Sequence, residues 1–361
     1  MLTSDNILKP FLCQFKMIAK KYSIFIYGIG AYGTFLAQYF QKHQIDFSGF
    51  VETIKKDDTY MGKEIYCVSD VPTSGWFLIS SYRHNDEMKK NLIINGISED
   101  QITLFPGAPV IYDAIIDVFE PTLYTQKLRS FKNLHEGARC FIVGNGPSLR
   151  VSDLDKLKKS ITMGCNNIFQ VYDQTKWRPT YYFEIDIELS KQLFYNKKFV
   201  EYVCSNCKAV FTGIWANLYQ YRNDSMISNL FFFSKRFVWN DKPEFSHDVS
   251  CGVYEGHTVV YDMLQFAAYM GFREIYLIGV DQNYVTYEKD DGSLTTSNEN
   301  KRNHAEFMDD TVSSIFPKVD KMRNAFLAAR IYAEANGIKI YNATRGGKLE
   351  IFERVDFDSL F

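Results

Sequence analysis

The sequence lacks any apolar run close to the ~20 consecutive residues that a helix needs to span a bilayer. It shows no secretory signal peptide either, because Asp5 comes early and lysines interrupt the first apolar stretch. Its seven cysteines include a single Cys-x-x-Cys pair, at 204–207, whereas a zinc site would need a second pair at suitable spacing. We therefore expect a cytoplasmic protein with reduced thiols.

An excess of positive charge is also missing. The chain has 41 Lys and Arg against 43 Asp and Glu, for a net charge of −2. Proteins that bind nucleic acid neutralise its backbone with a basic patch, so no nucleic-acid partner is expected. The 46% of apolar residues and 23% of charged residues are typical of a folded globular protein, and 361 residues suffice for two domains. The 16% of aromatic residues indicates either a bulky core, which we favour, or an aromatic surface for a ring-shaped ligand.

A glycine-rich turn marks the first domain, residues 1–105. The motif Gly-Ile-Gly-Ala-Tyr-Gly at 28–33 lies between a predicted strand at 23–27 and a predicted helix at 34–43. The next strand, 47–51, ends at an acidic residue about 20 positions on. Such glycines permit a tight turn and close helix–strand packing, and the helix N-terminus offers N–H donors to an anion. The residues of this candidate second ligand turn are Gly28, Gly30, Gly33 and Glu52.

Further strands and helices alternate as far as residue 105, which predicts a small Rossmann-like domain. It supplies one mononucleotide-binding half, whereas a dinucleotide site needs two. Three interpretations of the turn stay open: NAD binding, binding of a smaller nucleotide or sugar nucleotide, and a turn kept for folding, which we favour. The Pro-Gly-Ala-Pro segment at 106–109 then breaks the pattern. Two amphipathic stretches follow it, so residues 106–136 are predicted to form a helical linker.

A second turn opens the second domain, residues 137–361. The predicted strand at 138–143 runs into Gly-Asn-Gly-Pro-Ser-Leu at 144–149, which we call the phosphate turn. Its glycines admit unusual backbone angles, and its proline fixes φ and removes a donor. The side chains of Asn145 and Ser148 can hydrogen-bond a phosphate or a sugar. Because α/β folds hold phosphates where a strand meets a helix, we expect a nucleotide there.

Polar residues also follow other predicted strands of this domain, at 160–165, 180–185, 208–212, 229–233, 274–278 and 338–342. Asn166 and Asp186 each come directly after one of them, and Asp281 follows the strand at 274–278 after Gly279 and Val280. Each could be a turn former alone, since Asn and Asp are common in turns. Together they predict an α/β fold with mostly parallel sheets flanked by helices, and a binding site along one rim.

Three further segments are candidates for the site. The small-residue loop at 250–256 precedes a strongly apolar helix whose N-terminus could face an anion. The polar stretch at 282–302 predicts a long surface loop of the kind that forms lids, and His304 behind it is a candidate general base. Arg345 stands beside two glycines, and its guanidinium is suited to a phosphate or a carboxylate.

These motifs occur in the same order in two related families. The motifs are the phosphate turn, Cys-Asn at 165–166, Ser-Cys-Gly-Val-Tyr at 250–254 and Gly-Phe-Arg-Glu-Ile-Tyr-Leu-Ile-Gly-Val-Asp at 271–281. The chain resembles the bacterial sialyltransferases of the Campylobacter type together with the motility-associated-factor glycosyltransferases. It also resembles the family named for the archaeal 6-hydroxymethylpterin diphosphokinase. The ending Ile-Tyr-Asn-Ala-Thr-Arg-Gly-Gly at 340–347 is more similar to that second family and to the motility factors.

The sialyltransferase resemblance implies a role for each matching residue. His304 would deprotonate the acceptor, and Tyr284 would hydrogen-bond the departing phosphate. The residues that would bind the nucleotide or its sugar are Asn145, Gly146, Ser148, Asn166, Ser250 and Gly252. Asp186 and Asp281 are added because they follow strands, and Arg345 because it stands beside two glycines. Asp186 stands where this pattern has Asn, which favours the second family.

Two enzyme functions and one binding function follow as hypotheses. The preferred one is a glycosyltransferase for surface polysaccharide or glycoprotein that uses a nucleotide-activated sugar of the CMP-nonulosonate type. Its partners would be that donor and a glycan or protein acceptor, and it would require no cofactor. The alternative is an ATP-dependent diphosphokinase with Mg²⁺ held by Asp186 and Asp281. The third is a non-catalytic nucleotide-sensing module, and a homo-oligomer is among the assemblies the sequence allows.

Overall fold

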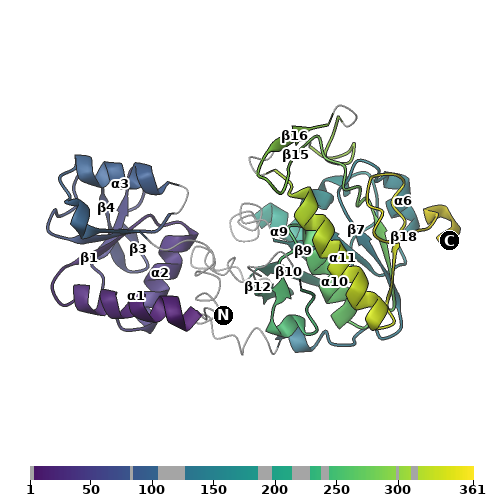
Figure 1. The fold of residues 1–361 in the computed structure, drawn as a ribbon, viewed down its shortest axis with the longest axis horizontal. Coiled ribbons are helices and arrows are strands. Elements are labelled where there is room, and N and C mark those ends of the chain that lie inside the picture. Colours follow the sequence, from purple (N-terminus) through teal and green to yellow (C-terminus); the bar gives the residue numbers. More distant parts are fainter. Residues whose placement is uncertain are drawn as a thin grey trace. The chain divides into compact units, whose positions relative to one another are not determined.

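The chain forms two compact units in the computed structural model, and each unit has its own sheet of mostly parallel strands (Figure 1). The described residues are 4–81, 84–104, 127–185, 197–213, 228–236, 244–297, 301–309 and 316–361. The first unit contains the described residues up to 104, and the second contains those from 127 onward. Asp186 and most of the predicted linker, 106–136, lie outside the described residues. Within the described part of the chain, none of the helices combines the length and the apolar character needed to cross a membrane.

The first unit is a six-stranded sheet with the strand order β3-β4-β2-β1-β5-β6. Its strands are β1 (Ile24–Tyr27), β2 (Gly49–Glu52), β3 (Thr59–Tyr60), β4 (Lys63–Cys67), β5 (Trp76–Ile79) and β6 (Ile102–Leu104). Its helices are α1 (Ser4–Ile18), α2 (Ala31–Lys42), α3 (Asn85–Ile94) and the 3-10 helix η1 (Glu99–Gln101). The strand β3 pairs antiparallel, in a short hairpin with β4. The other neighbours are parallel, as the predicted alternation of strands and helices requires.

The second unit contains an eight-stranded sheet with the order β11-β10-β9-β8-β7-β14-β17-β18. Its strands are β7 (Arg139–Val143), β8 (Thr162–Cys165), β9 (Tyr181–Glu184), β10 (Ala209–Gly213), β11 (Leu230–Phe233), β14 (Glu274–Ile278), β17 (Lys339–Asn342) and β18 (Glu353–Arg354). All neighbours in this sheet pair in parallel. The predicted α/β class with mostly parallel sheets is therefore confirmed.

Helices and short elements surround this second sheet. They are α6 (Val151–Lys156), η2 (Asn166–Val171), α9 (Lys197–Val203), η3 (Cys204–Asn206), η5 (Val249–Cys251), α10 (Val259–Tyr269), α11 (Val319–Ala335) and η6 (Phe357–Leu360). Two strand pairs lie outside the sheet: β12 (Lys235–Arg236) with β13 (Val253–Tyr254), and β15 (Thr286–Glu288) with β16 (Leu294–Thr296). The second pair adds detail to the predicted surface loop at 282–302, because the described part of that segment contains an antiparallel hairpin.

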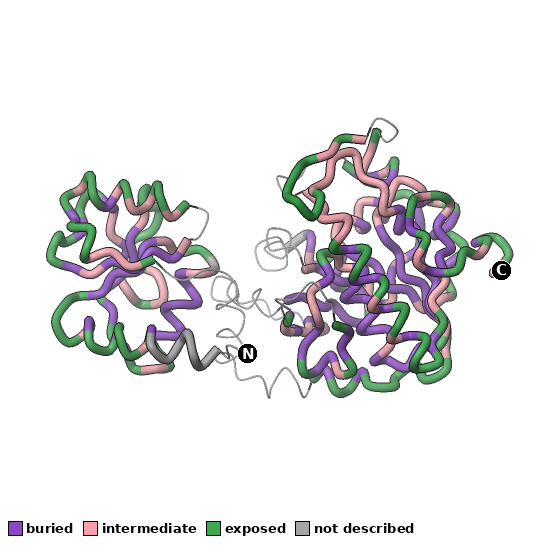
Figure 2. The backbone as a smooth tube through the Cα atoms, in the orientation of Figure 1, coloured by how far each residue is buried: buried purple, intermediate pink, exposed green. Residues whose placement is uncertain are grey.

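The core of the second unit is aromatic, and Figure 2 shows the buried residues concentrated along the strands of each unit. The ring of Phe211 lies 4.9 Å from that of Phe183 and 4.7 Å from that of Phe266, measured between centroids. Phe266 belongs to α10, which packs against β7, β9 and α11. Aromatic residues at these positions fill the space between sheet and helix, so the prediction of a bulky aromatic core is confirmed.

The strand order changes direction at β7. From β7 the chain adds β8, β9, β10 and β11 on one side, and it then crosses over to place β14 on the other side. The carboxyl ends of β7 and β14 therefore border a topological switch point, where open α/β sheets bind their ligands. The phosphate turn follows β7, and Gly279, Val280 and Asp281 follow β14.

Candidate functional site

The two turns at the switch point are hydrogen-bonded to each other. Asp281 accepts two hydrogen bonds from Ser148: from the backbone N–H to Oδ1 at 3.2 Å, and from the hydroxyl to Oδ2 at 2.9 Å. The backbone N–H of Gly146 also donates to the carbonyl of Gly279, at 2.8 Å. The structure therefore brings together three predicted site residues, and Asp281 holds the phosphate turn in place.

Close packing explains the glycines of this turn. A Cβ on Gly146 would lie 1.9 Å from Oδ2 of Asp281, and one on Gly144 would lie 2.4 Å from the carbonyl oxygen of Gly279. Neither glycine has a positive φ. The prediction that these glycines serve unusual backbone angles is therefore wrong: they are required because two backbone turns approach each other without room for a side chain.

Burial determines the electrostatics of Asp281, whose side chain is only 5% exposed. Desolvation raises the pKa of this carboxyl, while the hydrogen bonds from Ser148 and the positive charge of Arg354 oppose that rise. Behind it, the backbone N–H of Lys348 donates to the carbonyl oxygen of Asp281 at 2.6 Å. Asp281 is thus fixed from two sides, by the phosphate turn and by the loop that follows β17.

Two asparagines lie at the ends of the neighbouring strands β7 and β8. The side-chain amide of Asn145 donates to the carbonyl of Cys165 at 3.1 Å, which joins the two strand ends. Oδ1 of Asn145 and Oδ1 of Asn166 are both buried, and neither has a hydrogen-bond partner among the residues that the structure describes. Asn166 also has a positive φ of 48°. Since buried polar atoms are normally hydrogen-bonded, these two oxygens are available to donors on a ligand.

The segment that carries the predicted base contacts the phosphate turn. The N–H of Ala305 donates to the carbonyl of Asn145 at 2.9 Å, which places His304 next to this turn. Arg302 fixes the same segment, because its guanidinium donates to the carbonyls of Ala305 at 3.3 Å and Met308 at 2.7 Å. The sequence did not single out Arg302, whose partners are backbone carbonyls and leave no motif.

Tyr284 and Arg345 have partners within the protein. The hydroxyl of Tyr284 lies 3.7 Å from Sδ of Met322 on α11, and burial, with Asp281 nearby, raises its pKa to about 12. The guanidinium of Arg345 makes ion pairs with Asp153 at 2.9 Å and with Asp358 at 2.6 Å. Both side chains connect parts of the fold, and the ligand contacts predicted for them remain predictions.

Ser250 and Gly252 belong to a different constellation. The hydroxyl of Ser250 donates to Oδ1 of Asp248 at 2.6 Å. Gly252 has a φ of 109°, and a Cβ there would lie 2.7 Å from the hydroxyl oxygen of Ser234. Contacts within this loop and with the β12–β13 pair thus explain why serine and glycine stand at these positions. A contact of either residue with a donor sugar remains a prediction.

A buried charged cluster lies beyond that loop. Nζ of Lys235 is 2.7 Å from Oε2 of Glu255 and 3.1 Å from Oδ2 of Asp262. Burial raises the pKa of Asp262 to about 7, although the lysine opposes this. The charge of Asp262 also contributes to a raised pKa of the Cys165 thiol, so the cluster lies near the end of β8. A signal for it existed in the sequence: one acid within the apolar run of the α10 helix.

The glycine-rich turn of the first unit also lies at a switch point, between β1 and β5. Gly28 has a φ of 101°, and a Cβ on Gly33 would lie 1.8 Å from the carbonyl oxygen of Gly28. A Cβ on Gly30, in contrast, would have none of the described atoms within 4 Å. Glu52 ends β2 beside this turn. The turn conformation and the close packing explain two of the glycines, and ligand binding at this turn stays a prediction.

Fold and site together define the second unit as a parallel α/β domain whose clamped glycine turn lies at the switch point. Residues 120–286 match the model of a protein family described as 6-hydroxymethylpterin diphosphokinase MptE-like. The match includes both the phosphate turn and Asp281, and the family resemblance predicted from the motifs is confirmed over this range. No curated protein sequence matches the chain.

One similar solved structure is the sialyltransferase CstII from Campylobacter jejuni in complex with a substrate analogue, cytidine-5'-monophosphate. The sequence identity is 15%, and the alignment covers 61% of this chain and 85% of that chain, with a TM-score of 0.35.

Proposed function

We propose that this chain is a transferase that binds a nucleotide at the β7/β14 switch point. In our preferred form it is a glycosyltransferase whose donor is a CMP-activated nonulosonate or a similar nucleotide sugar, and whose acceptor is a surface polysaccharide or a glycoprotein. One observation carries this proposal: the segment of His304 is hydrogen-bonded to the phosphate turn. This contact supports the proposal, because a general base must lie close to the nucleotide whose sugar it helps to transfer.

The chemistry required of these residues is modest. Breaking the bond between sugar and phosphate leaves negative charge on the departing CMP, which backbone N–H groups and neutral side-chain donors can stabilise. A neutral His304 would take the proton of the acceptor hydroxyl as its oxygen bonds to the sugar carbon. General-base catalysis of this kind contributes about 10²–10⁴-fold. The phenol of Tyr284 remains protonated at neutral pH, as a donor to the leaving phosphate must.

A second candidate is diphosphoryl transfer from ATP, which the description of the matching family favours. It would need Mg²⁺, with Asp186 and Asp281 as its protein ligands. Both carboxylate oxygens of Asp281 already accept hydrogen bonds from Ser148, which favours metal-independent transfer of a sugar. Asp186 lies outside the described residues. The third candidate, a non-catalytic nucleotide-sensing module, needs no general base. It therefore predicts that His304 is not required for function.

The experiment is a release assay on the full chain. CMP-activated sialic acid with a panel of glycan acceptors is compared with ATP, Mg²⁺ and 6-hydroxymethylpterin, and released CMP or AMP is quantified. We expect CMP release, reduced at least 10²-fold in His304→Ala and unchanged in His84→Ala, an exposed histidine of the first unit. AMP release without CMP release would establish the second candidate, and equal activity of His304→Ala would exclude this base.

A further inference from the structure

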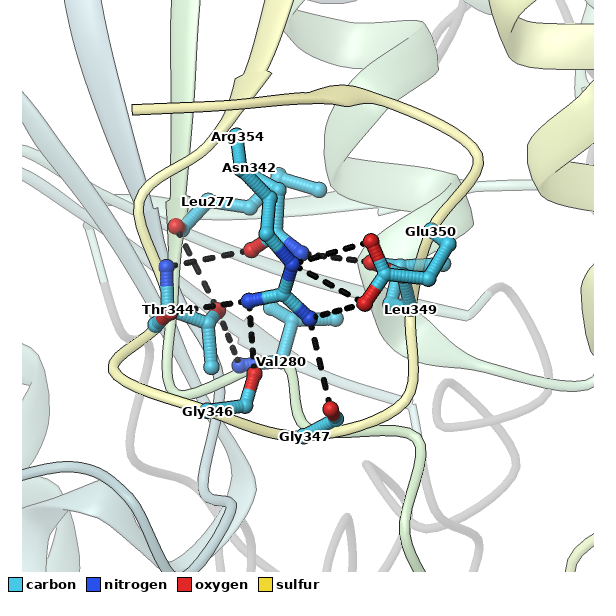
Figure 3. Close-up of polar contacts among 9 residues, drawn as sticks. All are labelled: Leu277, Val280, Asn342, Thr344, Gly346, Gly347, Leu349, Glu350 and Arg354. Carbon is cyan, nitrogen blue, oxygen red and sulfur yellow. Dashed lines mark hydrogen bonds and ion pairs between the residues drawn. The ribbon is translucent and has the colours of Figure 1, made fainter. Parts of the chain in front are cut away.

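Arg354, on the edge strand β18, hydrogen-bonds to backbone carbonyls of a loop in the second unit (Figure 3). Its guanidinium donates to the carbonyl of Gly346 at 2.9 Å and to those of Thr344 and Gly347 at 3.3 Å. The planar guanidinium group thus binds three backbone carbonyls at once. The loop from 344 to 350 wraps around this side chain.

Glu350 fixes the orientation of that guanidinium group. Nε of Arg354 donates to both carboxylate oxygens of Glu350, at 2.9 and 3.0 Å, and Nη2 lies 2.6 Å from Oε1. Such paired hydrogen bonds set the plane of the guanidinium as well as its distance. The carboxylate of Glu350 and the three carbonyls therefore all bind the guanidinium of Arg354, which links the two ends of the loop.

The loop lies directly behind Asp281. Gly347, with a φ of 76°, packs so closely that a Cβ on it would lie 2.4 Å from the carbonyl oxygen of Asp281. The N–H of Lys348 donates to that oxygen at 2.6 Å, and the hydroxyl of Thr344 accepts from Val280 at 3.2 Å. Whatever holds the loop therefore also holds the backbone of the β14 turn.

An electrostatic link runs alongside the mechanical one. The positive charge of Arg354 lowers the pKa of Asp281, against the larger effect of burial, and thereby favours the ionised carboxylate. That carboxylate accepts both hydrogen bonds from Ser148 of the phosphate turn. Arg354 thus supports Asp281 both through the loop and through its charge.

We propose that Arg354 is a positioning residue for the phosphate turn, acting through the loop 344–350 and Asp281. The consequence for nucleotide affinity rests on the proposed function, whereas the consequence for the turn itself does not. Arg354 is on the last strand of the sheet and touches neither Ser148 nor His304 in the contacts that define its role. We therefore expect its effect on a ligand to pass through Asp281.

The test compares Arg354→Gln, Arg354→Lys and Arg330→Gln in the full chain. Arg330 is a matched control, because it donates to one backbone carbonyl, that of Ile351, from the surface of α11. Amide hydrogen exchange on ligand-free protein is measured at 144–149 and 344–350. We expect Arg354→Gln to exchange at least about tenfold faster in both segments, as loss of interactions worth one hydrogen bond or more implies. The Arg330 variant should match the wild type.

Titration calorimetry with CMP, and separately with ATP and Mg²⁺, supplies the second readout. We expect Arg354→Gln to weaken binding about tenfold, Arg354→Lys to restore part of it through the retained charge, and the effect to disappear in an Asp281→Asn background. Additive effects of the two substitutions, or unchanged exchange at 144–149, would overturn the proposal. If Arg354→Gln does not fold, Arg354→Lys and Glu350→Gln decide by the same criteria. Faster exchange at 144–149 in Arg354→Gln, beside a wild type that binds neither nucleotide, would contradict the proposed function alone.

Discussion

Ser148 and Asp281 are joined by two hydrogen bonds across the carboxyl ends of two neighbouring strands, although 133 positions separate them in the sequence. Parallel strands that follow one another only after a long excursion meet in this way at a switch point. The pair therefore marks where the first strand of this sheet meets a strand from much later in the chain, beside the candidate site.

The hydroxyl of Ser148 should stabilise the domain measurably. Ser148→Ala leaves Oδ2 of the buried Asp281 without this donor, so the free energy of unfolding should fall by about 1–3 kcal/mol in urea denaturation. Ser293→Ala is the matched control, because its hydroxyl donates to Asp291 in an exposed pair. That control should change stability by less than about 0.5 kcal/mol. Equal effects in the two variants would show that the Ser148 contact has no special role.

Gly146→Ala should destabilise the second unit, because the turn has no room for a side chain at this position. The added Cβ would meet Oδ2 of Asp281, so either the carboxylate or the turn must move. We expect a loss of about 1–3 kcal/mol in stability, as for other overpacked sites, together with weaker nucleotide binding. Gly30→Ala tests the opposite case, since a Cβ there has open space, and its stability should change little. An Ala at 146 that leaves stability and binding unchanged would contradict the geometry of the clamp.

A substitution at Arg345 tests whether this residue stabilises the fold or binds the ligand. Arg345→Gln leaves Asp153, whose side chain is 5% exposed, without its cation, and should lower stability by about 2 kcal/mol. Asp153→Asn in the same chain should recover part of this loss, because the unpaired buried charge is then removed. Nucleotide affinity should stay within about threefold of the wild type. A loss of affinity beyond tenfold would instead support the anion-binding role predicted from the sequence.

Asp262 makes stability depend on pH. Its pKa is raised from 3.8 to about 7 in the folded chain, so the folded state retains a proton that the unfolded state releases. The contribution is fully present below about pH 4 and is lost as pH rises towards about 7, with a slope of at most about 1.4 kcal/mol per pH unit. The stability of the wild type relative to Asp262→Asn should fall across this range. A constant difference from pH 4 to 7 would show that Asp262 is ionised throughout.

Periodicity and turn residues predicted much of the fold. The strands expected at 138–143 and 274–278 are present as Arg139–Val143 and Glu274–Ile278, because short apolar runs bounded by Gly and Asp are typical of buried parallel strands. Asn166 and Asp281 were predicted from their places after strands, and the parallel sheet then brings such strand ends to one rim. Local sequence carries this information, since each strand end is visible by itself.

Long-range contacts could not be predicted in the same way. Lys235 pairs with two carboxylates that only the folded chain brings near it. Arg354 and Arg302 act on nearby backbone carbonyls, and a carbonyl leaves no mark in the sequence because every residue has one. The helix α1 was missed because lysines and Pro10 interrupt its apolar pattern, although Phe15 on it is fully buried. The hairpin within 282–302 was missed because its strands are only three residues long.

Thermal unfolding of the wild type, Ser148→Ala and Gly146→Ala with CMP, CMP-sialic acid, NAD, and ATP with Mg²⁺ tests the central claim most directly. If CMP binds at the phosphate turn, CMP at about 100 times its dissociation constant should stabilise the wild type by ~2.7 kcal/mol. The gain at the same concentration should be clearly smaller in Gly146→Ala. Stabilisation by ATP with Mg²⁺ and not by CMP would contradict the preferred chemistry. A CMP effect that Gly146→Ala fully retains would contradict the site itself.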